Sequence, residues 1–380
     1  MKNIKEKIEA SLMLSSYFET IGFKNGSWEF NYRYNIKTIH EYTSIMSTLL
    51  NHYLILGGNM IDITGFNSSD DTILLIATAE AVIEGGGLEI YKKYYVDSYE
   101  LLLDEKRASG EITLSSIKLL KQHKMPSIKE TMGGNGAAMR TGSIGLRWYK
   151  DYDKVIEESI VASMLTHNYY IGFLGGMVVA LFTSFAMNNI KPWKWVDSLL
   201  SLYDSIKKYY PKEHNIEDLD DYMSYWKRYK ETRLSKLKYK NSLDFFIFPE
   251  DRAEYLLGFS PIPKIKNMVM KGQRLNHLTN EWSMMARTGI DTCIYAYDCI
   301  LMSLQSPNNK VLDFDNITYN FNTFMTLVCI HPGDNDTTAA IGGTWIGALL
   351  GYADVFDKSN LKKLEFYKEL KKVSDKMIII

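Results

Sequence analysis

Apolar residues recur along this chain with the spacing of helices rather than of strands. The clearest run, residues 71–83, is apolar almost all round and rich in good helix formers, and further apolar helical patterns cover residues 155–165, 171–187 and 295–304. Period-2 alternation between turn residues is scarce, and strand-like and helix-like segments do not alternate. Proline, which breaks helices, occurs only eight times in 380 residues. The pattern predicts an all-α fold.

The chain carries no internal repeat or low-complexity linker that would mark a domain boundary. We therefore expect residues 1–380 to form a single domain. The segment at about 191–285 is more polar and aromatic, and contains Trp193, Trp195 and Trp226. This divergent segment is either an insertion or a set of peripheral helices packed on the core.

Residues 171–187 form the stretch closest to a membrane span. The run is at the short limit for crossing a bilayer, and it contains Thr183 and Ser184. A buried core helix is the better interpretation, and we expect no membrane partner.

Composition excludes several classes of protein. Hydrophobic residues make up 46% of the chain and charged residues 23%, a globular profile, while the net charge of −1 lacks the footprint of a nucleic-acid binder. The basic run 227–240 is interpreted as a solvated helix face or loop. Three cysteines form no metal-binding pattern, and the N-terminus lacks a signal-peptide core. We expect a cytoplasmic monomer.

Small residues recur one helical turn apart near the C-terminus, at Ala339, Gly343, Gly347 and Gly351. A bulky stripe lies beside them at Ile341, Trp345 and Leu349. Glycine inside a helix is costly, and close approach of another helix would offset about 2–3 kcal/mol. The glycines therefore predict close packing that fixes where this helix begins, at Asp334-x-Asp336-Thr337.

A second acidic cluster, Ser69-Asp70-Asp71-Thr72, precedes another apolar helix. Each cluster alone is explained by helix capping. Two clusters at buried helix ends would instead bring four carboxylates together, and these would take up protons unless cations neutralised them. Two divalent ions would balance the four charges. The oxygen donors favour Mg²⁺, Mn²⁺ or Ca²⁺ over Zn²⁺.

Four blocks of sequence resemble the ADP-ribosylhydrolases, the ADP-ribosylglycohydrolase family. HPGDNDTTAAIGGTWIGALLG (331–351) resembles the family signature, and SSDDT (68–72) resembles its first metal motif. GNGAAMRTGSIGL (134–146) is similar to the glycine-rich segment along bound ADP-ribose, and LTH (165–167) with GFLGG to the next block. NGSWEF (25–30) and TGIDTCIYAYDCIL (288–301) resemble the arginine-specific branch.

The resemblance implies an all-α hydrolase that removes ADP-ribose from ADP-ribosylated arginine on proteins. It implies two Mg²⁺ ions, with Mn²⁺ as a substitute, bound by Ser69, Asp70, Asp71, Asp334, Asp336 and Thr337. It also implies ADP-ribosylated proteins as partners and ADP-ribose as a product. The residues that it assigns to substrate binding are Gly134, Asn135, Gly136, Ala137, His167, Gly289 and Asp291.

Glycosidic cleavage needs a positioned water and a carboxyl group that handles protons. Glu29 and Asp334 are the candidate catalytic residues, with Glu29 either a mobile carboxylate that gates the ribose or an ordinary exposed glutamate. By themselves the glycine-rich segment could be a turn and His167 a hydrogen-bonded core histidine. Arg140 could pair structurally with an acidic residue and is given no role.

The chain departs from the family pattern at three places. Phe18 and Glu19 stand in a run where the family has Gly-Asp-Ala-Leu-Gly, residues 283–287 read SMMAR where the branch is rich in glycine and serine, and Ile290 replaces a histidine. Two alternatives follow: a degenerate binder of ADP-ribose without turnover, or a hydrolase of serine-linked or small-molecule ADP-ribose. The intact metal motifs argue against full degeneracy.

Overall fold

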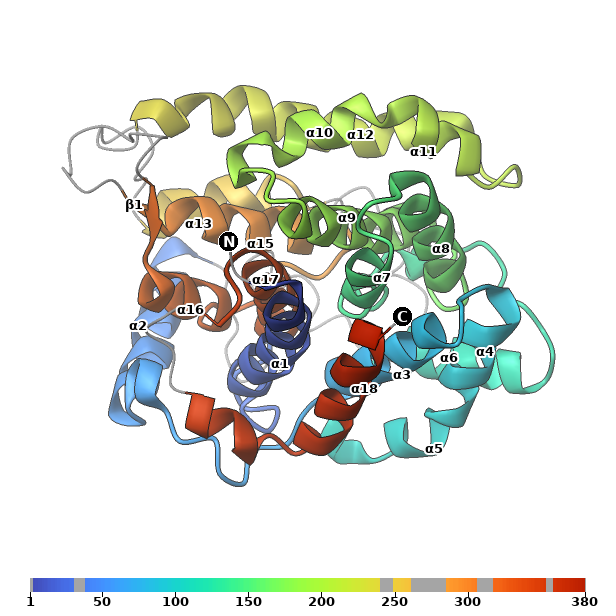
Figure 1. Cartoon of the computed structure of the whole chain (residues 1–380). Coiled ribbons are helices and arrows are strands. Elements are labelled where there is room, and N and C mark those ends of the chain that lie inside the picture. The colour runs from blue at the N-terminus through green and yellow to red at the C-terminus, as the bar shows by residue number, and fades with distance from the viewer. Residues whose placement is uncertain are drawn as a thin grey trace.

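The computed structural model describes residues 3–30, 38–239, 249–260, 285–305, 317–352 and 358–379 (Figure 1). In the first half these ranges contain α1 (Ile4–Phe23), α2 (Ile39–Ile55), α3 (Asp70–Ile83), α4 (Leu88–Asp97), α5 (Tyr99–Leu102), α6 (Glu111–Lys121), α7 (Gly142–Arg147), α8 (Tyr152–Met164) and α9 (Tyr170–Met187). The second half adds α10 (Trp195–Ser201), α11 (Tyr203–Tyr209), α12 (Ile216–Thr232), α13 (Pro249–Leu257), α15 (Asp291–Met302), α16 (Phe321–Cys329), α17 (Asn335–Leu350) and α18 (Tyr367–Ile379). Short strands β1 (Leu304–Gln305) and β2 (Thr318–Tyr319) pair antiparallel. The all-α prediction is confirmed.

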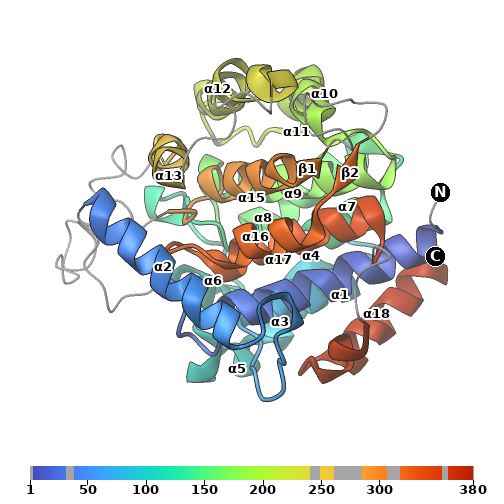
Figure 2. The same cartoon turned by 90° about the vertical axis from the view of Figure 1, so that its left-hand side faces the viewer.

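Helix α17 lies at the centre of the molecule and packs along α1 (Figures 1 and 2). The glycine stripe makes this contact possible. A Cβ added to Gly343 would lie 2.3 Å from the carbonyl oxygen of Leu14, and one added to Gly347 would lie 2.5 Å from the Cα of Ser11. The predicted close helix contact is therefore confirmed, with α1 as the partner.

Gly351 does not belong to that stripe. Helix α17 ends at Leu350, and Gly351 caps it with a φ of 64°, a conformation that favours glycine. Other predicted boundaries also move. The run 155–165 is part of a helix over Tyr152–Met164, and the run 295–304 falls in α15, which begins at Asp291 and ends at Met302.

Helix α9 is long and apolar enough to cross a membrane by length and composition, yet all of it is buried within the protein. The prediction of a buried core helix is confirmed. Around it, α10, α11 and α12 form an outer layer (Figure 1). Trp195 and Trp226 of this layer are fully buried against Phe182 of α9. The described part of the divergent segment therefore packs on the core.

The basic run at 227–240 is not a uniformly solvated face. Lys227 and Lys230 are exposed on α12, as expected. Arg233, at the end of α12, is buried, and its Nε donates a hydrogen bond to Asp298 of α15 at 2.9 Å. The interpretation is wrong at Arg233 because a buried carboxylate, distant in sequence, lies opposite it. Lys240 lies outside the described residues.

Candidate functional site

The first acidic turn, residues 68–71, opens α3. Ser69 caps this helix, because its hydroxyl accepts a hydrogen bond from the backbone N–H of Asp71 at 3.2 Å. Glu19 of α1 is fully buried beside the turn. Its carboxylate accepts hydrogen bonds from the backbone N–H of Ser69 and from the hydroxyl of Thr72, the latter at 2.8 Å. Helix α1 therefore holds the turn in place.

Phe18, the neighbouring departure from the family pattern, points elsewhere. Its ring packs against Phe321 and Phe324 of α16, with ring centroids 5.6 and 5.9 Å apart. The added bulk is accommodated in the hydrophobic core, whereas Glu19 hydrogen-bonds the first acidic turn. The sequence pointed to Glu19 only as a departure from the family motif, and its role in holding the first acidic turn is visible only in the structure.

The second acidic turn, residues 334–337, opens α17. The backbone N–H of Thr337 donates to the carboxylates of Asp334 at 3.4 Å and Asp336 at 2.9 Å. Asp334 itself donates its N–H to the carbonyl of Met285 at 3.0 Å. Gly22 of α1 allows close approach here, since an added Cβ would lie 2.7 Å from the carbonyl oxygen of Asn335.

The structure brings the two acidic turns together. The hydroxyl of Thr337 donates to Asp71 at 3.4 Å, which joins the start of α17 to the start of α3. Oxygen atoms of Glu29, Asp334 and Asp336 all lie within 4.8 Å of one another. We call these two turns with Glu29 the acidic centre. Its aspartates are all buried.

Repulsion and burial shape the ionisation of the acidic centre. Burial, followed by the charge of Asp334, raises the pKa of Asp70 to about 7. Burial and the neighbouring carboxylates raise the pKa values of Asp71 and Asp336 well above their usual range. Within the described part of the chain, no lysine or arginine forms a salt bridge with these aspartates.

Glu29 belongs to this centre and is not an exposed surface glutamate. It is half-buried, between the core residue Trp28 and Phe30, whose N–H donates to the carbonyl of Gly333 at 2.9 Å. Burial and the charges of Asp334 and Asp70 raise the pKa of Glu29 well above its usual range. Its carboxyl group is therefore inclined to hold a proton beside the second acidic turn.

The glycine-rich segment lies against the TGID segment beside the second acidic turn. Gly134 forms a β-bridge with Thr288, and the N–H of Asn135 donates to the carbonyl of Arg287 at 3.2 Å. The side-chain amide of Asn135 donates to Asp334 at 2.9 Å. Asn135 thus orients a carboxylate of the acidic centre, a role that its place in a glycine-rich segment did not reveal.

His167 covers the glycine-rich segment. A Cβ added to Gly136 would lie 2.7 Å from the imidazole Cε1, so this position leaves space for the ring. The imidazole Nδ1 lies 2.8 Å from the hydroxyl of Thr166. Burial, with the nearby charge of Arg140, lowers the pKa of His167 to about 3, so the ring is neutral. Ala137 beside it is fully buried.

Arg140 does not pair with an acid among the described residues. Its guanidinium donates at 2.7 Å both to the carbonyl of Gly136 and to the hydroxyl of Thr166, and it lies over the ring of Tyr95. The expected acidic partner is replaced by these neutral groups. Arg140 therefore holds the glycine-rich segment and the His167 segment together.

The TGID segment is placed largely by packing. A Cβ added to Gly289 would lie 2.1 Å from the carbonyl oxygen of Ile171, so this glycine lets the segment lie on α9. Ile290 is fully buried in the core. Asp291 accepts a hydrogen bond from the N–H of Thr288 at 2.7 Å, and burial raises its pKa to about 6. Ser283, where the run SMMAR begins, lies outside the described residues.

The donor set of the acidic centre fits a hard divalent cation. Carboxylate and hydroxyl oxygens converge there from two helix ends, without thiolates. One carboxylate oxygen of Asp71, Oδ2, is buried without a hydrogen-bond partner among the described residues. An unpaired buried oxygen is costly unless a cation or a proton satisfies it. The centre could therefore bind metal.

Comparisons with known proteins show the family to which the chain is similar. The family model of the ADP-ribosylglycohydrolases matches residues 25–379. The chain is 31% identical to the protein "ADP-ribosylhydrolase ARH1" of Dictyostelium discoideum, over 95% of this chain and 91% of that one. It is 28% identical to "Putative ADP-ribosyl glycohydrolase L444" of Acanthamoeba polyphaga mimivirus, over 89% of this chain and 62% of the viral protein.

A solved structure described as "ADP-ribosylglycohydrolase-related protein complex" shares the fold, with a TM-score of 0.50 over 98% of both chains at 12% identity. The family match spans most of the sequence, and both acidic turns lie within it. The chain therefore belongs to the ADP-ribosylglycohydrolase family. It is an ADP-ribosyl glycohydrolase of a metal-dependent family, with ADP-ribosylated substrates and ADP-ribose as product.

Proposed function

We propose that this enzyme is an arginine-specific ADP-ribosylhydrolase that works with two Mg²⁺ ions, for which Mn²⁺ can substitute. The observation that carries the metal requirement is the meeting of four buried aspartates without a lysine or arginine partner among the described residues. The similarity of NGSWEF and TGIDTCIYAYDCIL to the arginine-specific branch supports the substrate.

The two acidic turns would supply the ligands from opposite sides. Ser69, Asp70 and Asp71 belong to the first set, and Asp334, Asp336 and Thr337 to the second. Bound ions would neutralise the carboxylates, polarise the ribose hydroxyls and lower the pKa of a nearby water. The unpaired Oδ2 of Asp71 and the absence of thiolates from the donor set support this assignment.

Hydrolysis adds water across the bond between ribose C1″ and a guanidinium nitrogen. The hydroxyl goes to C1″ and a proton goes to the departing nitrogen. Glu29 is suited to holding a proton, because burial and neighbouring carboxylates favour its neutral form. Asp334 is oriented by Asn135 and is suited to positioning the water.

The glycine-rich segment and the neutral His167 would bind the ADP-ribose. Gly134, Asn135, Gly136 and Ala137 bring backbone close to the acidic centre, and side-chain-free backbone can approach a diphosphate. Asp291 would complete the substrate-binding set, with Gly289 placing its segment on α9.

The test compares two linkages on one enzyme. Proteins carrying labelled ADP-ribosyl-arginine or ADP-ribosyl-serine are incubated with the enzyme, with Mg²⁺ or with a chelator. We expect Mg²⁺-dependent release of ADP-ribose from arginine. Release of ADP-ribose from serine alone would contradict the proposed specificity for arginine. Equal release with the chelator and with Mg²⁺ would contradict the metal requirement. Binding of ADP-ribose without release from either linkage would favour a degenerate binder.

We further propose that the enzyme acts as a cytoplasmic monomer on ADP-ribosylated proteins, with neither nucleic acid nor membrane as partner. The near-zero net charge supports the absence of a nucleic-acid partner. The three cysteines form neither a metal-binding nor a paired motif, which suits a reducing compartment such as the cytoplasm. Sedimentation of the purified protein and fractionation of cells test it.

A further inference from the structure

A partly buried ion pair lies beside the first acidic turn. Arg107, in a short 3-10 helix (Glu105–Arg107), donates from Nη1 and Nη2 to the two carboxylate oxygens of Glu365 at 2.7 and 2.8 Å. This two-pronged geometry is the strongest form of an arginine–carboxylate contact. Only 6% of the Arg107 side chain is exposed, against 33% for Glu365.

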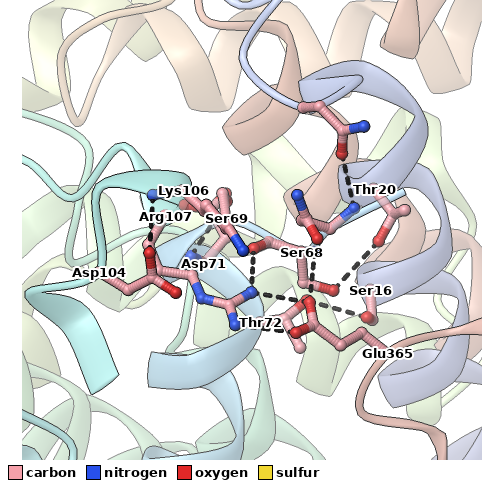
Figure 3. A network of polar contacts seen from close by, with 12 residues as sticks. Ser16, Thr20, Ser68, Ser69, Asp71, Thr72, Asp104, Lys106, Arg107 and Glu365 are labelled. Carbon is pink, nitrogen blue, oxygen red and sulfur yellow. Dashed lines mark hydrogen bonds and ion pairs between the residues drawn. The ribbon is translucent and has the colours of Figure 1, made fainter. Parts of the chain in front are cut away.

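Both members of the pair also hold the backbone of Ser68, the residue that opens the first acidic turn (Figure 3). Glu365 accepts a hydrogen bond from the N–H of Ser68 at 3.1 Å. Arg107 donates from Nη1 to the carbonyl oxygen of Ser68 at 2.9 Å. The hydroxyl of Ser68 lies 3.2 Å from that of Thr20 on α1. Ser68 is therefore fixed on three sides by segments far apart in the sequence.

The next residue along the turn is fixed in the same way. The N–H of Ser69 donates to Glu19 of α1, so carboxylates from α1 and from the segment before α18 hold two consecutive backbone N–H groups. Asp104 in turn fixes Arg107, since its carboxylate accepts the N–H of Lys106 at 3.1 Å and its carbonyl accepts the N–H of Arg107 at 2.9 Å. The guanidinium of Arg107 thus projects from a backbone that Asp104 already holds in place.

We propose that Arg107 and Glu365 are positioning residues of the metal site, which set its affinity for divalent cations by fixing the backbone from which Ser69, Asp70 and Asp71 project. The inference rests on the metal site of the proposed function. Helix capping by Ser69 orients the first turn of α3, but it does not fix how the turn lies relative to α17. The ion pair restrains the turn from another side, by tying Ser68 to Glu365 in the segment that precedes α18.

The test measures metal affinity directly. Titration calorimetry with Mg²⁺ alone is carried out on the full chain of the wild type, Glu365→Gln and Arg107→Lys. Glu365→Gln keeps the shape of the side chain and removes its negative charge. Arg107→Lys keeps the positive charge and removes the two parallel hydrogen bonds of the guanidinium. Loss of groups that orient metal ligands weakens affinity by about 10–100-fold, and we expect about tenfold here because the pair acts through the backbone. The double variant should be no weaker than the worse single variant.

Glu158→Gln is the matched control. Like Glu365, Glu158 accepts one backbone N–H, from Gly87 at 2.8 Å, and pairs with a basic side chain, Lys154, at 2.7 Å, although its own side chain is more buried. It holds a loop outside the acidic centre, so Glu158→Gln should lower the thermal midpoint and leave the Mg²⁺ dissociation constant unchanged.

The outcomes separate this inference from the proposed function. A tenfold weaker dissociation constant in Glu365→Gln and Arg107→Lys, but not in Glu158→Gln, supports the positioning role. An unchanged constant in either member of the pair, equal weakening in the control, or additive losses in the double variant overturns it while leaving the proposed function intact. A wild type that binds no Mg²⁺ overturns both.

Discussion

The buried carboxylate of Asp298 and the buried aspartates of the acidic centre have opposite surroundings. Asp298 of α15 is fully buried, and it accepts hydrogen bonds from Arg233 at 2.9 Å, from Arg252 at 2.7 Å and from Tyr229 at 2.6 Å. The aspartates of the acidic centre are buried as well, yet within the described part of the chain they make no salt bridge to lysine or arginine.

The difference appears in their ionisation. Burial alone would raise the pKa of Asp298, but the two guanidinium groups outweigh it and hold the pKa well below its usual range. Burial and like charge raise the pKa values of Asp71 and Asp336 instead. The chain neutralises Asp298 with its own side chains and leaves the acidic centre to be neutralised from outside, by protons or by cations. A stabilising ion pair and a binding site are thus told apart by the presence of a partner.

Removing the charge of Asp298 should have the largest effect on stability. Asp298→Asn keeps the shape of the side chain and leaves two buried guanidinium groups without a counter-charge. Breaking a buried ion pair in this way costs about 3–5 kcal/mol. Urea unfolding at pH 7 measures the loss, and a loss below about 1 kcal/mol would contradict the expected dependence on the pair.

Acid should remove the stabilisation that the charged carboxylate of Asp298 contributes to the folded state. Because the folded-state pKa of Asp298 is depressed, its contribution is present above the unfolded pKa of about 3.9 and is lost as the pH falls through the folded value. The difference in unfolding free energy between the wild type and Asp298→Asn should therefore shrink from pH 7 toward pH 3. A constant difference across this range would mean that Asp298 acts through shape rather than charge.

The opposite test removes one carboxylate from the acidic centre. Asp334→Ala should lower turnover of ADP-ribosyl-arginine by at least about 10²-fold, equal to about 2.7 kcal/mol, since metal stabilisation of charge is worth several kcal/mol. Asp334→Asn is the companion variant, because it can keep the cap on Thr337. Equal turnover in Asp334→Asn and the wild type would show that the capping role alone accounts for Asp334.

Local features of both regions were predictable from the sequence, and their partners were not. Helices α3 and α9 begin within one residue of the predicted positions, because apolar periodicity is a local signal, as is the capping residue Ser69 at the start of α3. The glycines of α17 predicted a closely packed helix, but the pattern held no information on which helix would fill the stripe. Convergence of the acidic turns was inferred because both clusters open helices apolar enough to be buried, and it is now seen in the contact between Thr337 and Asp71.

The partners of Asp298 and of Ser68 carried no local signal. Arg233 lies 65 positions from Asp298 among exposed lysines, so its run looked like a solvated face. Glu365 lies 297 positions from Ser68, in a segment that resembled nothing in the family signature. Such contacts follow from how the helices assemble, and a single sequence does not encode them as a readable pattern.

Mg²⁺ should stabilise the enzyme through the acidic centre and not through Asp298. A cation at ten times its dissociation constant stabilises the folded state by about 1.4 kcal/mol, provided that it binds only that state. The thermal midpoint of the wild type and of Asp298→Asn should rise similarly with Mg²⁺, and Asp334→Ala should lose most of the rise. A wild-type midpoint that Mg²⁺ leaves unmoved would contradict the two-metal site.

The smallest effect is expected at Asp197, which has the same charges as Asp298 in a solvated setting. Asp197 lies 2.7 Å from Lys230 and 3.9 Å from Lys194, so it too faces two cations, but 40% of its side chain is exposed. Water and salt screen such pairs, which contribute under about 1 kcal/mol. Asp197→Asn should therefore change the unfolding free energy by less than 1 kcal/mol and leave the response to Mg²⁺ intact. Urea unfolding could instead show a loss of unfolding free energy as large as that of Asp298→Asn. In that case the number of cationic partners, rather than burial, would decide how much a carboxylate contributes to stability. The contrast between Asp298 and the acidic centre would then rest on their partners alone.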